Sequence, residues 1–183
     1  MKSLLISVLF VATLTGSLRG QGKYLTNRGQ IIFYSHTAIE DITAENNKVA
    51  SVIDAASGEV AIIVKMTDFQ FEKKMMQEHF NENYVESEKF PKAVFNGKIL
   101  NNADVKYASK GIYQVQVEGE MTIHGKTNQV SAGGTIEVDA EGIVIRAKFM
   151  LNPEDYDITI PNVVRKNIAE ALEIRVEINH LPI

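Results

Sequence analysis

The stretch Leu172-Glu173-Ile174-Arg175-Val176-Glu177-Ile178-Asn179 decides the fold class of this chain. Four aliphatic side chains alternate with four polar ones, so an extended backbone places all the aliphatic groups on one face. This period of two is typical of a β-strand that is buried on one side and exposed on the other. The stretch therefore predicts a strand in a sheet whose inner face is apolar.

The same alternation recurs toward the N-terminus. It covers residues 143–151, 113–123, 93–99 and 60–66, and it is weaker around Ile31, Phe33 and Val49 to Ile53. Strands of this kind, spaced along the whole chain, are typical of all-β proteins. We expect an antiparallel meander of about eight strands, which closes into an up-and-down β-barrel or folds into a sandwich.

Turn-forming residues separate these segments. Ser57-Gly58, His124-Gly125 and residues 140–142 lie between consecutive strands, where a residue with positive φ closes a hairpin at little cost. Gly133-Gly134 instead falls inside a segment, which predicts a bulge or a sharp bend.

One region, residues 69–84, breaks the β pattern. Met75 and His79, like Met76 and Phe80, are four residues apart, which predicts a short helix from Glu72 to Phe80. His79 would lie on its apolar side, which favours a buried, hydrogen-bonded imidazole over a metal ligand. A second short helix is expected from Asn162 to Ala169, after Pro161.

The N-terminus has the layout of a secretory signal peptide. A basic start at Lys2 is followed by an apolar run from Leu4 to Leu14 and by small and polar residues up to Gly20. The run is too short to cross a bilayer core of roughly 30 Å. We expect residues 1–20 to be removed, which leaves a single domain, 21–183, in the periplasm or, as the alternative, secreted from the cell.

The charge composition of the chain argues against a nucleic-acid partner. The formal net charge of −4 becomes −6 when Lys2 and Arg19 leave with the signal peptide, and no long basic run follows. We therefore expect no nucleic-acid partner. The charge, the predicted helix and the proline-containing loops favour a water-soluble barrel over a membrane-spanning one.

Signatures of catalysis and of metal binding are missing from the sequence. There is no Gly-x-Ser-x-Gly or His-Glu-x-x-His motif and no cysteine, and the four histidines have no ligand spacing. The carboxylates are spread along polar strand faces, where they serve solubility. We therefore expect a protein that is not an enzyme and has no metal and no cofactor.

The apolar strand faces are what remains as a candidate site. An eight-stranded barrel is just wide enough to be filled by side chains or to hold one small ligand, and periodicity does not distinguish these two cases. Alternation predicts that Phe95 and Met66 face the interior while Lys92 and Lys98 face water. The aromatic and methionine side chains expected to line the interior are Phe33, Met66, Phe69, Phe71, Met75, Phe80, Phe95, Tyr113, Met121 and Phe149.

Three segments of the chain resemble the YceI-like polyisoprenoid-binding proteins. They are residues 71–97, with Phe90-Pro91-Lys92-Ala93-Val94-Phe95-Asn96-Gly97 as their most specific part, the hairpin 117–127 and the segment 149–158. The resemblance implies a lipocalin-like barrel around a long apolar tunnel that holds a polyprenyl lipid or the tail of a quinone. It implies no catalytic residues.

Two functions follow as hypotheses. In the first, the protein sequesters or carries a polyisoprenoid or prenyl-quinone lipid, which is bound as an isoprenoid ligand rather than as a cofactor. In the second, it is an envelope stress or interaction protein whose barrel is a scaffold without a bound lipid.

Overall fold

The computed structural model describes residues 22–183, so the expected signal peptide lies outside the described residues. This described part of the chain forms nine strands: β1 (Lys23–His36), β2 (Asp41–Asp54), β3 (Glu59–Lys65), β4 (Gln70–Phe71), β5 (Lys92–Ile99), β6 (Gly111–Ile123), β7 (Lys126–Val138), β8 (Ile143–Leu151) and β9 (Leu172–Pro182). The helical segments are η1 (Met66–Asp68), α1 (Lys74–His79), η2 (Phe80–Tyr84), η3 (Asn102–Asp104) and η4 (Pro153–Tyr156).

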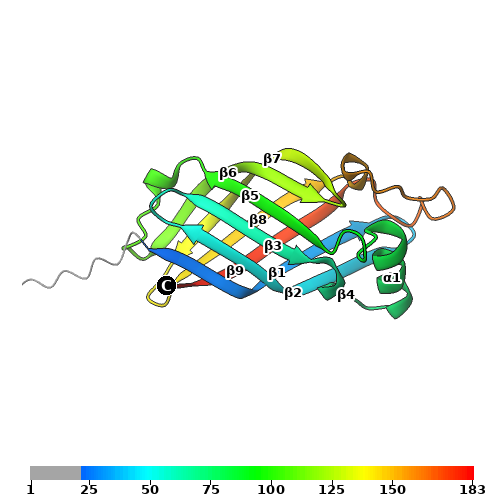
Figure 1. The fold of residues 1–183 in the computed structure, drawn as a ribbon, viewed down its shortest axis with the longest axis horizontal. Coiled ribbons are helices and arrows are strands. Elements are labelled where there is room, and N and C mark those ends of the chain that lie inside the picture. Colours follow the sequence, from blue (N-terminus) through cyan, green and yellow to red (C-terminus); the bar gives the residue numbers. More distant parts are fainter. Residues whose placement is uncertain (1–21) are drawn as a thin grey trace, which may run out of the picture.

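Eight of these strands close into an antiparallel barrel (Figure 1). The order is β1-β9-β8-β7-β6-β5-β3-β2, and pairing of β1 with β2 closes the ring. The two-residue strand β4 pairs with β2 at one end. Apart from the pair β1 and β9, neighbours in the barrel follow one another in the sequence once the short β4 is left out, which confirms the predicted up-and-down β-barrel and excludes the sandwich.

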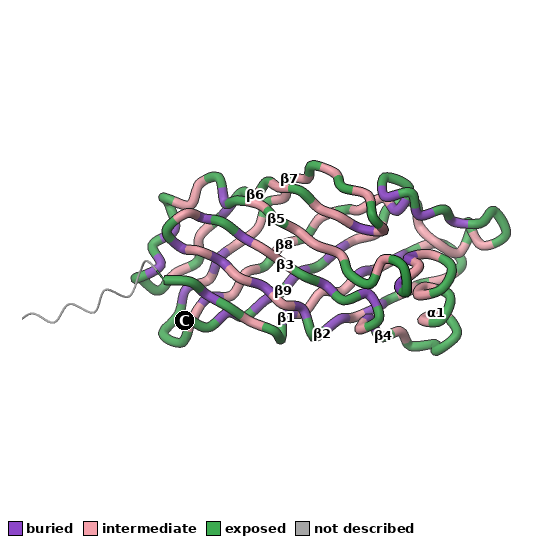
Figure 2. The backbone as a smooth tube through the Cα atoms, in the orientation of Figure 1, coloured by how far each residue is buried: buried purple, intermediate pink, exposed green. Residues whose placement is uncertain are grey.

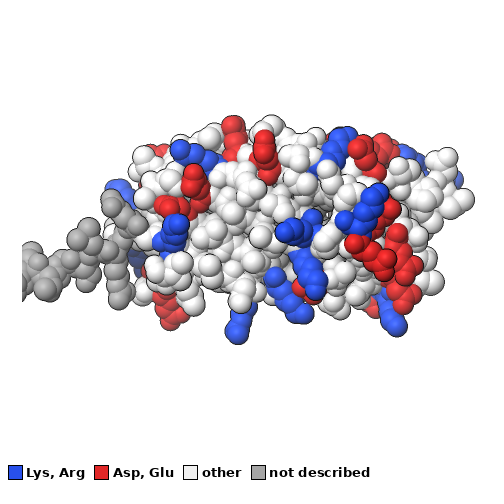
Figure 3. Space-filling view, in the orientation of Figure 1, with Lys and Arg blue, Asp and Glu red and all other residues white. Residues whose placement is uncertain are grey.

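The alternating pattern of the sequence explains which side of each strand faces inward. Along β9, Ile174, Val176, Ile178 and His180 are buried, and the residues between them are exposed (Figure 2). Lys92 and Lys98 of β5 are exposed as predicted, and the outer surface carries charges of both signs (Figure 3). The hairpin between β6 and β7 is closed by His124 and Gly125, both with positive φ, as the sequence predicts.

The two ends of the barrel differ. At the end near the C-terminus, residues 100–110 cover the barrel (Figure 1), Val105 and Tyr107 are buried, and Tyr107 stacks on Tyr24 with ring centroids 5.8 Å apart. A continuous apolar core that includes Ile53, Ile99 and Ile136 fills this closed end. At the opposite end lie α1, η2 and the long connection of residues 152–171 between β8 and β9 (Figure 1).

Of the bulge or sharp bend predicted at Gly133-Gly134, the bulge is absent. Both glycines stay in register with β6, opposite Gln116 and Val115. Glycine is required at position 134 because the backbones of β7 and β8 approach closely there: a Cβ would lie 2.5 Å from the carbonyl oxygen of Arg146 in β8. The register shifts occur in β1 instead, on either side of Gly29.

The helix predictions were correct in one place and wrong in another. The first helix exists, but its α-helical part is limited to Lys74–His79 and continues as the π-helix η2. Residues 162–167 form successive turns rather than a helix, with the amide of Asn167 donating to the carbonyl of Val164. The adjacent β-branched Val163 and Val164 disfavour a helix this short, and the amide of Ala169 donates to Ser35 Oγ.

Helices that could span a membrane are lacking in residues 22–183, because none of them is both long and apolar enough.

Candidate ligand-binding cavity

The barrel encloses a cavity of about 450 Å³. It runs from the core of the closed end, at Ile53, Ile99 and Ile136, to the end that carries α1 and the 152–171 connection. Its lining is almost entirely aliphatic and aromatic. Glu40, His79 and Arg146 are the acidic and basic residues among the lining residues of the described chain.

Inward-facing residues in the middle of the barrel are only half-buried, which is the sign of a hollow interior. Val117 and Met121 of β6, Ala132 of β7 and Ala147 of β8 all point inward and line the cavity. In a close-packed interior, such residues would be fully buried. Their remaining exposure is toward the cavity, so the barrel is hollow rather than filled.

Eight of the ten predicted interior residues line this cavity. They are Phe33, Met66, Phe69, Phe71, Phe80, Phe95, Met121 and Phe149. They come from seven separate elements and, in the case of Phe69, from the loop between η1 and β4. In the strands among them, alternation is what turns these side chains inward.

The prediction for Met75 is wrong, whereas Tyr113 faces the interior as predicted but does not reach the cavity. Met75 lies on the outer side of α1 and is 65% exposed, because a helix of six residues turns a single stripe inward, here Met76 and Phe80. Tyr113 is outside the lining, packs against the core of the closed end and donates its hydroxyl to the carbonyl of Ser109. His79 was expected to be buried but is exposed at the rim of the cavity.

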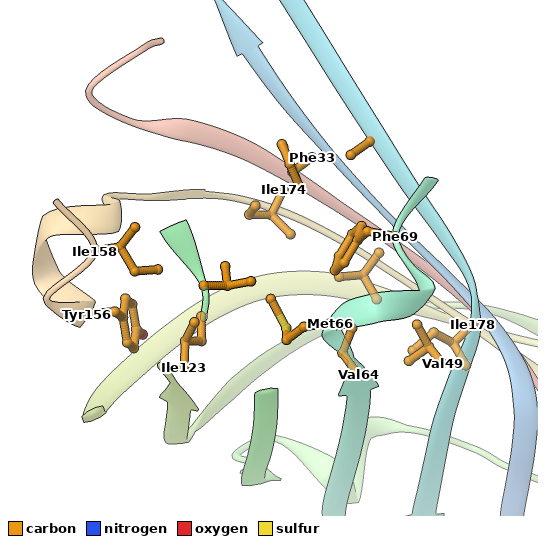
Figure 4. Close-up of a cluster of buried hydrophobic side chains, with 13 residues drawn as sticks. Phe33, Val49, Val64, Met66, Phe69, Ile123, Tyr156, Ile158, Ile174 and Ile178 are labelled. Atoms are coloured by element: carbon orange, nitrogen blue, oxygen red, sulfur yellow. The ribbon is translucent and has the colours of Figure 1, made fainter. Parts of the chain in front are cut away.

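Four phenylalanines form a cluster at the α1 end of the cavity. The ring of Phe80 lies 5.1 Å from that of Phe71, 5.6 Å from that of Phe69 and 5.7 Å from that of Phe33. Figure 4 shows Phe33, Phe69 and Met66 turned toward the interior. Such rings bind apolar groups without directional demands, which suits a hydrocarbon ligand.

A set of polar contacts, which we call the rim latch, joins three segments around this end. Glu40, in the β1–β2 hairpin, accepts from Lys73 Nζ at 2.8 Å and from Asn167 Nδ2 at 3.2 Å. The hydrogen bond from Lys73 holds the pKa of the Glu40 carboxyl below its usual value. Sequence reasoning missed these residues, because 33 and 127 positions separate the partners.

His124 makes a second set of contacts at the same end. Its Nε2 lies 2.8 Å from Glu86 Oε2, and its Nδ1 lies 3.2 Å from the carbonyl oxygen of Tyr156. The ring also packs edge-on against Phe90, with centroids 4.5 Å apart. The hairpin turn therefore ties the segments after η2 and in η4 to the barrel, a role that its position in a turn did not reveal.

Two of the charged groups at this cavity are already paired with other side chains. Across residues 22–183, no group of three or more His, Asp or Glu side chains is placed to hold a metal ion. Glu40 is engaged with Lys73, and Arg146 donates to Glu137 and Glu177. The arrangement is suited to enclosing an apolar chain.

Comparison with known proteins agrees with this architecture. The model of the YceI-like domain family matches residues 24–180. A polyisoprenoid-binding domain from Saccharophagus degradans, implicated in plant cell wall breakdown, superposes with a TM-score of 0.76 at 13% identity, covering 89% of this chain and 99% of that domain.

Two further solved structures are similar. BcnA of Burkholderia cenocepacia gives a TM-score of 0.67 at 14% identity and covers 81% of this chain and 94% of its own. The YceI protein of Campylobacter jejuni gives a TM-score of 0.57 at 17% identity, and the match covers 79% of this chain and 88% of that protein. No curated protein matches the chain. Identities this low show a shared fold, whereas the family match extends over nearly all the described residues, and the chain therefore belongs to the YceI-like domain family.

Proposed function

We propose that this protein sequesters or carries a long hydrocarbon lipid, a polyisoprenoid or the tail of a prenyl quinone, and performs no chemistry on it. The observation that carries the proposal is the hollow interior, about 450 Å³, with a lining that is aliphatic and aromatic almost throughout. The polyisoprenoid-binding domain of Saccharophagus degradans, which has the same fold, supports the choice of lipid.

The physical basis of affinity is the removal of apolar surface from water. A polyprenyl chain has no hydrogen-bonding groups along its length, so each buried Å² contributes roughly 25 cal/mol and few polar contacts are needed. The half-buried side chains of Val117, Met121 and Ala147 supply the protein's share of that surface. An apolar interior of this kind gains stability when a lipid replaces the void.

The N-terminus supports a place in the periplasm, with secretion as the alternative. A signal peptide over residues 1–20 would direct export of the domain from the cytoplasm. N-terminal sequencing of the exported protein should begin near Gln21. Retention of Met1 in exported material would contradict this part of the proposal.

Native mass spectrometry of gently purified protein is the direct test of lipid binding. We expect an adduct with the mass of a prenyl lipid. The variant Val117→Trp places an indole across the middle of the cavity and should lose the adduct, whereas Glu118→Trp places the same side chain on the outer face of β6 and should keep it. Ligand-free spectra of the unmodified protein from lipid-rich cells would favour the scaffold hypothesis.

A further inference from the structure

The barrel wall has a stretch without main-chain pairing between β7 and β8. β7 pairs with β6 over its whole length, from Lys126 to Val138, but with β8 only from Gly134 to Val138. β8 continues to pair with β9 as far as Leu151. Residues 129–133 of β7 and 148–151 of β8 therefore face each other as two free strand edges, and we call the space between them the side window.

The side window is bounded at both ends. On one side, the ladder resumes at the pair Gly134 and Ala147. On the other, Asn128 Nδ2 donates to the carbonyl of Asp155 in η4 at 2.7 Å, and Lys126 Nζ lies 2.8 Å from Asp157 Oδ1. The unpaired stretch is thus a defined opening in a wall that is held together above and below it.

A comparable gap elsewhere in the wall is sealed. β2 and β3 pair over only four residues, from Ala50 to Ile53, and the chain then inserts η1 and β4 beside β2. Asn46, fully buried, donates to the carbonyl of Lys65, and Met66 and Phe69 close the space with buried side chains. The side window has no such insertion between its two bounding contacts.

The cavity reaches the outer face of the barrel at this place. Ser131 of β7 has an exposed, outward-facing position, yet it lines the interior cavity. The neighbours Ala132, Gly133 and Gly134 have small side chains or none, so the wall here is little thicker than the backbone. Inward of the gap lie Phe149 and Leu151, and Met150 beside it is 60% exposed on the outside.

We propose that the side window is the passage through which the hydrocarbon chain of the lipid enters and leaves the barrel sideways. This inference rests on the proposed lipid-binding function. At the α1 end, the rim latch and the hydrogen bond that the amide of Ala169 donates to Ser35 Oγ hold the surrounding segments together, so passage there would have to separate them. The side window requires no main-chain hydrogen bond to break, and apolar side chains flank it.

A reversible cross-link across the side window tests the proposal. Continuing the register of Gly134 with Ala147 places Ser131 opposite Met150, and the chain has no cysteine of its own. In the double variant Ser131→Cys/Met150→Cys, a disulfide, or a short bis-maleimide if the thiols do not join, closes the window. Uptake of a fluorescent prenyl alcohol by lipid-free protein should then slow by roughly tenfold or more relative to the same variant with free thiols.

A cross-link in a paired part of the wall is the control. Lys98→Cys/Glu118→Cys joins β5 to β6 at a registered pair, and uptake should be equal before and after cross-linking. If closing the side window leaves uptake unchanged while the unmodified protein binds the alcohol, the side-window proposal is wrong and lipid binding stands. If the unmodified protein binds no prenyl alcohol, it is the proposed function that fails.

Discussion

His180 of β9 carries an imidazole that is 1% exposed, between the strands of the closed end. Its Nδ1 donates to the carbonyl of Ile178 at 3.2 Å, and its Nε2 accepts from the hydroxyl of Ser51 at 2.9 Å. Both contacts suit the neutral ring, and burial lowers the pKa of His180 from 6.5 to about 4. The side chain stabilises the fold only while it is uncharged.

The pH dependence of unfolding follows from this lowered pKa. As the pH falls below 6.5, the unfolded chain gains a proton at His180 before the folded protein does, so stability is fully present above 6.5 and declines toward 4. The loss should be on the order of 3 kcal/mol in chemical denaturation. Compared with the unmodified protein, His180→Gln should show a flatter profile between pH 6.5 and 4.5, and an equally steep one would contradict the assignment.

Phe95 distinguishes a hollow interior from a filled one. Its ring lies over Gly97 and lines the cavity, so part of its surface has no protein neighbour. In a filled core, Phe95→Ala would cost roughly 3–5 kcal/mol, and in this cavity we expect a smaller loss for the lipid-free protein, below about 3 kcal/mol. The same change should weaken binding of a prenyl analogue.

Lys98 offers a matched control for Phe95 on the same strand. It is exposed, and it lies between Glu59 and Glu118 of the adjacent strands, so Lys98→Gln is preferable to a charge reversal, which would place three acids side by side. Lys98→Gln should change stability by no more than about 0.5 kcal/mol and leave binding unchanged. A Phe95→Ala loss as large as in a filled core, with no loss of binding, would contradict the hollow barrel.

The rim latch joins three elements that the sequence does not connect. Glu40 comes from the β1–β2 hairpin, Lys73 directly precedes α1, and Asn167 belongs to the connection between β8 and β9. We expect Glu40→Gln to change the free energy of unfolding little, because exposed ion pairs contribute little. It should, however, speed amide hydrogen exchange in residues 157–171, while exchange in β6 and β7 stays the same. Equal protection in both proteins would contradict the latch.

Strands could be predicted more reliably than the segments that join them. The strands at 143–151 and near 172–179 agree with the structure closely, because one face of each is buried and a period of two is a strong local signal. The stretch at 162–169 carries apolar residues at helical spacing, but it folds as turns because its partners, such as Ser35, lie more than 130 positions away. Tertiary contacts of this range leave no local pattern.

For the whole molecule too, the local sequence pattern predicts less than the structure contains: it did not predict that the barrel is hollow. Alternation correctly placed Met66, Phe95 and Met121 inside, but it did not predict whether inward side chains would meet or leave a cavity. That depends on how small residues such as Ala132, Gly134 and Ala147 combine on neighbouring strands. It also depends on where β7 and β8 cease to pair, which no sequence period marks.

A hollow apolar barrel should be stabilised by its ligand as a whole. A lipid that binds the folded state alone, present at about 100 times its dissociation constant, contributes roughly 2.7 kcal/mol. For a domain of this size, that corresponds to a rise of about 5–10 °C in the unfolding midpoint. We therefore expect lipid-stripped protein to unfold at a higher temperature once a long prenyl alcohol is added. The variant Val117→Trp should show no such rise, because its indole obstructs the path of a long chain through the cavity, whereas Glu118→Trp should respond like the unmodified protein. An equal rise in all three proteins would place the lipid outside the cavity, and no rise in any of them would leave the barrel as a scaffold.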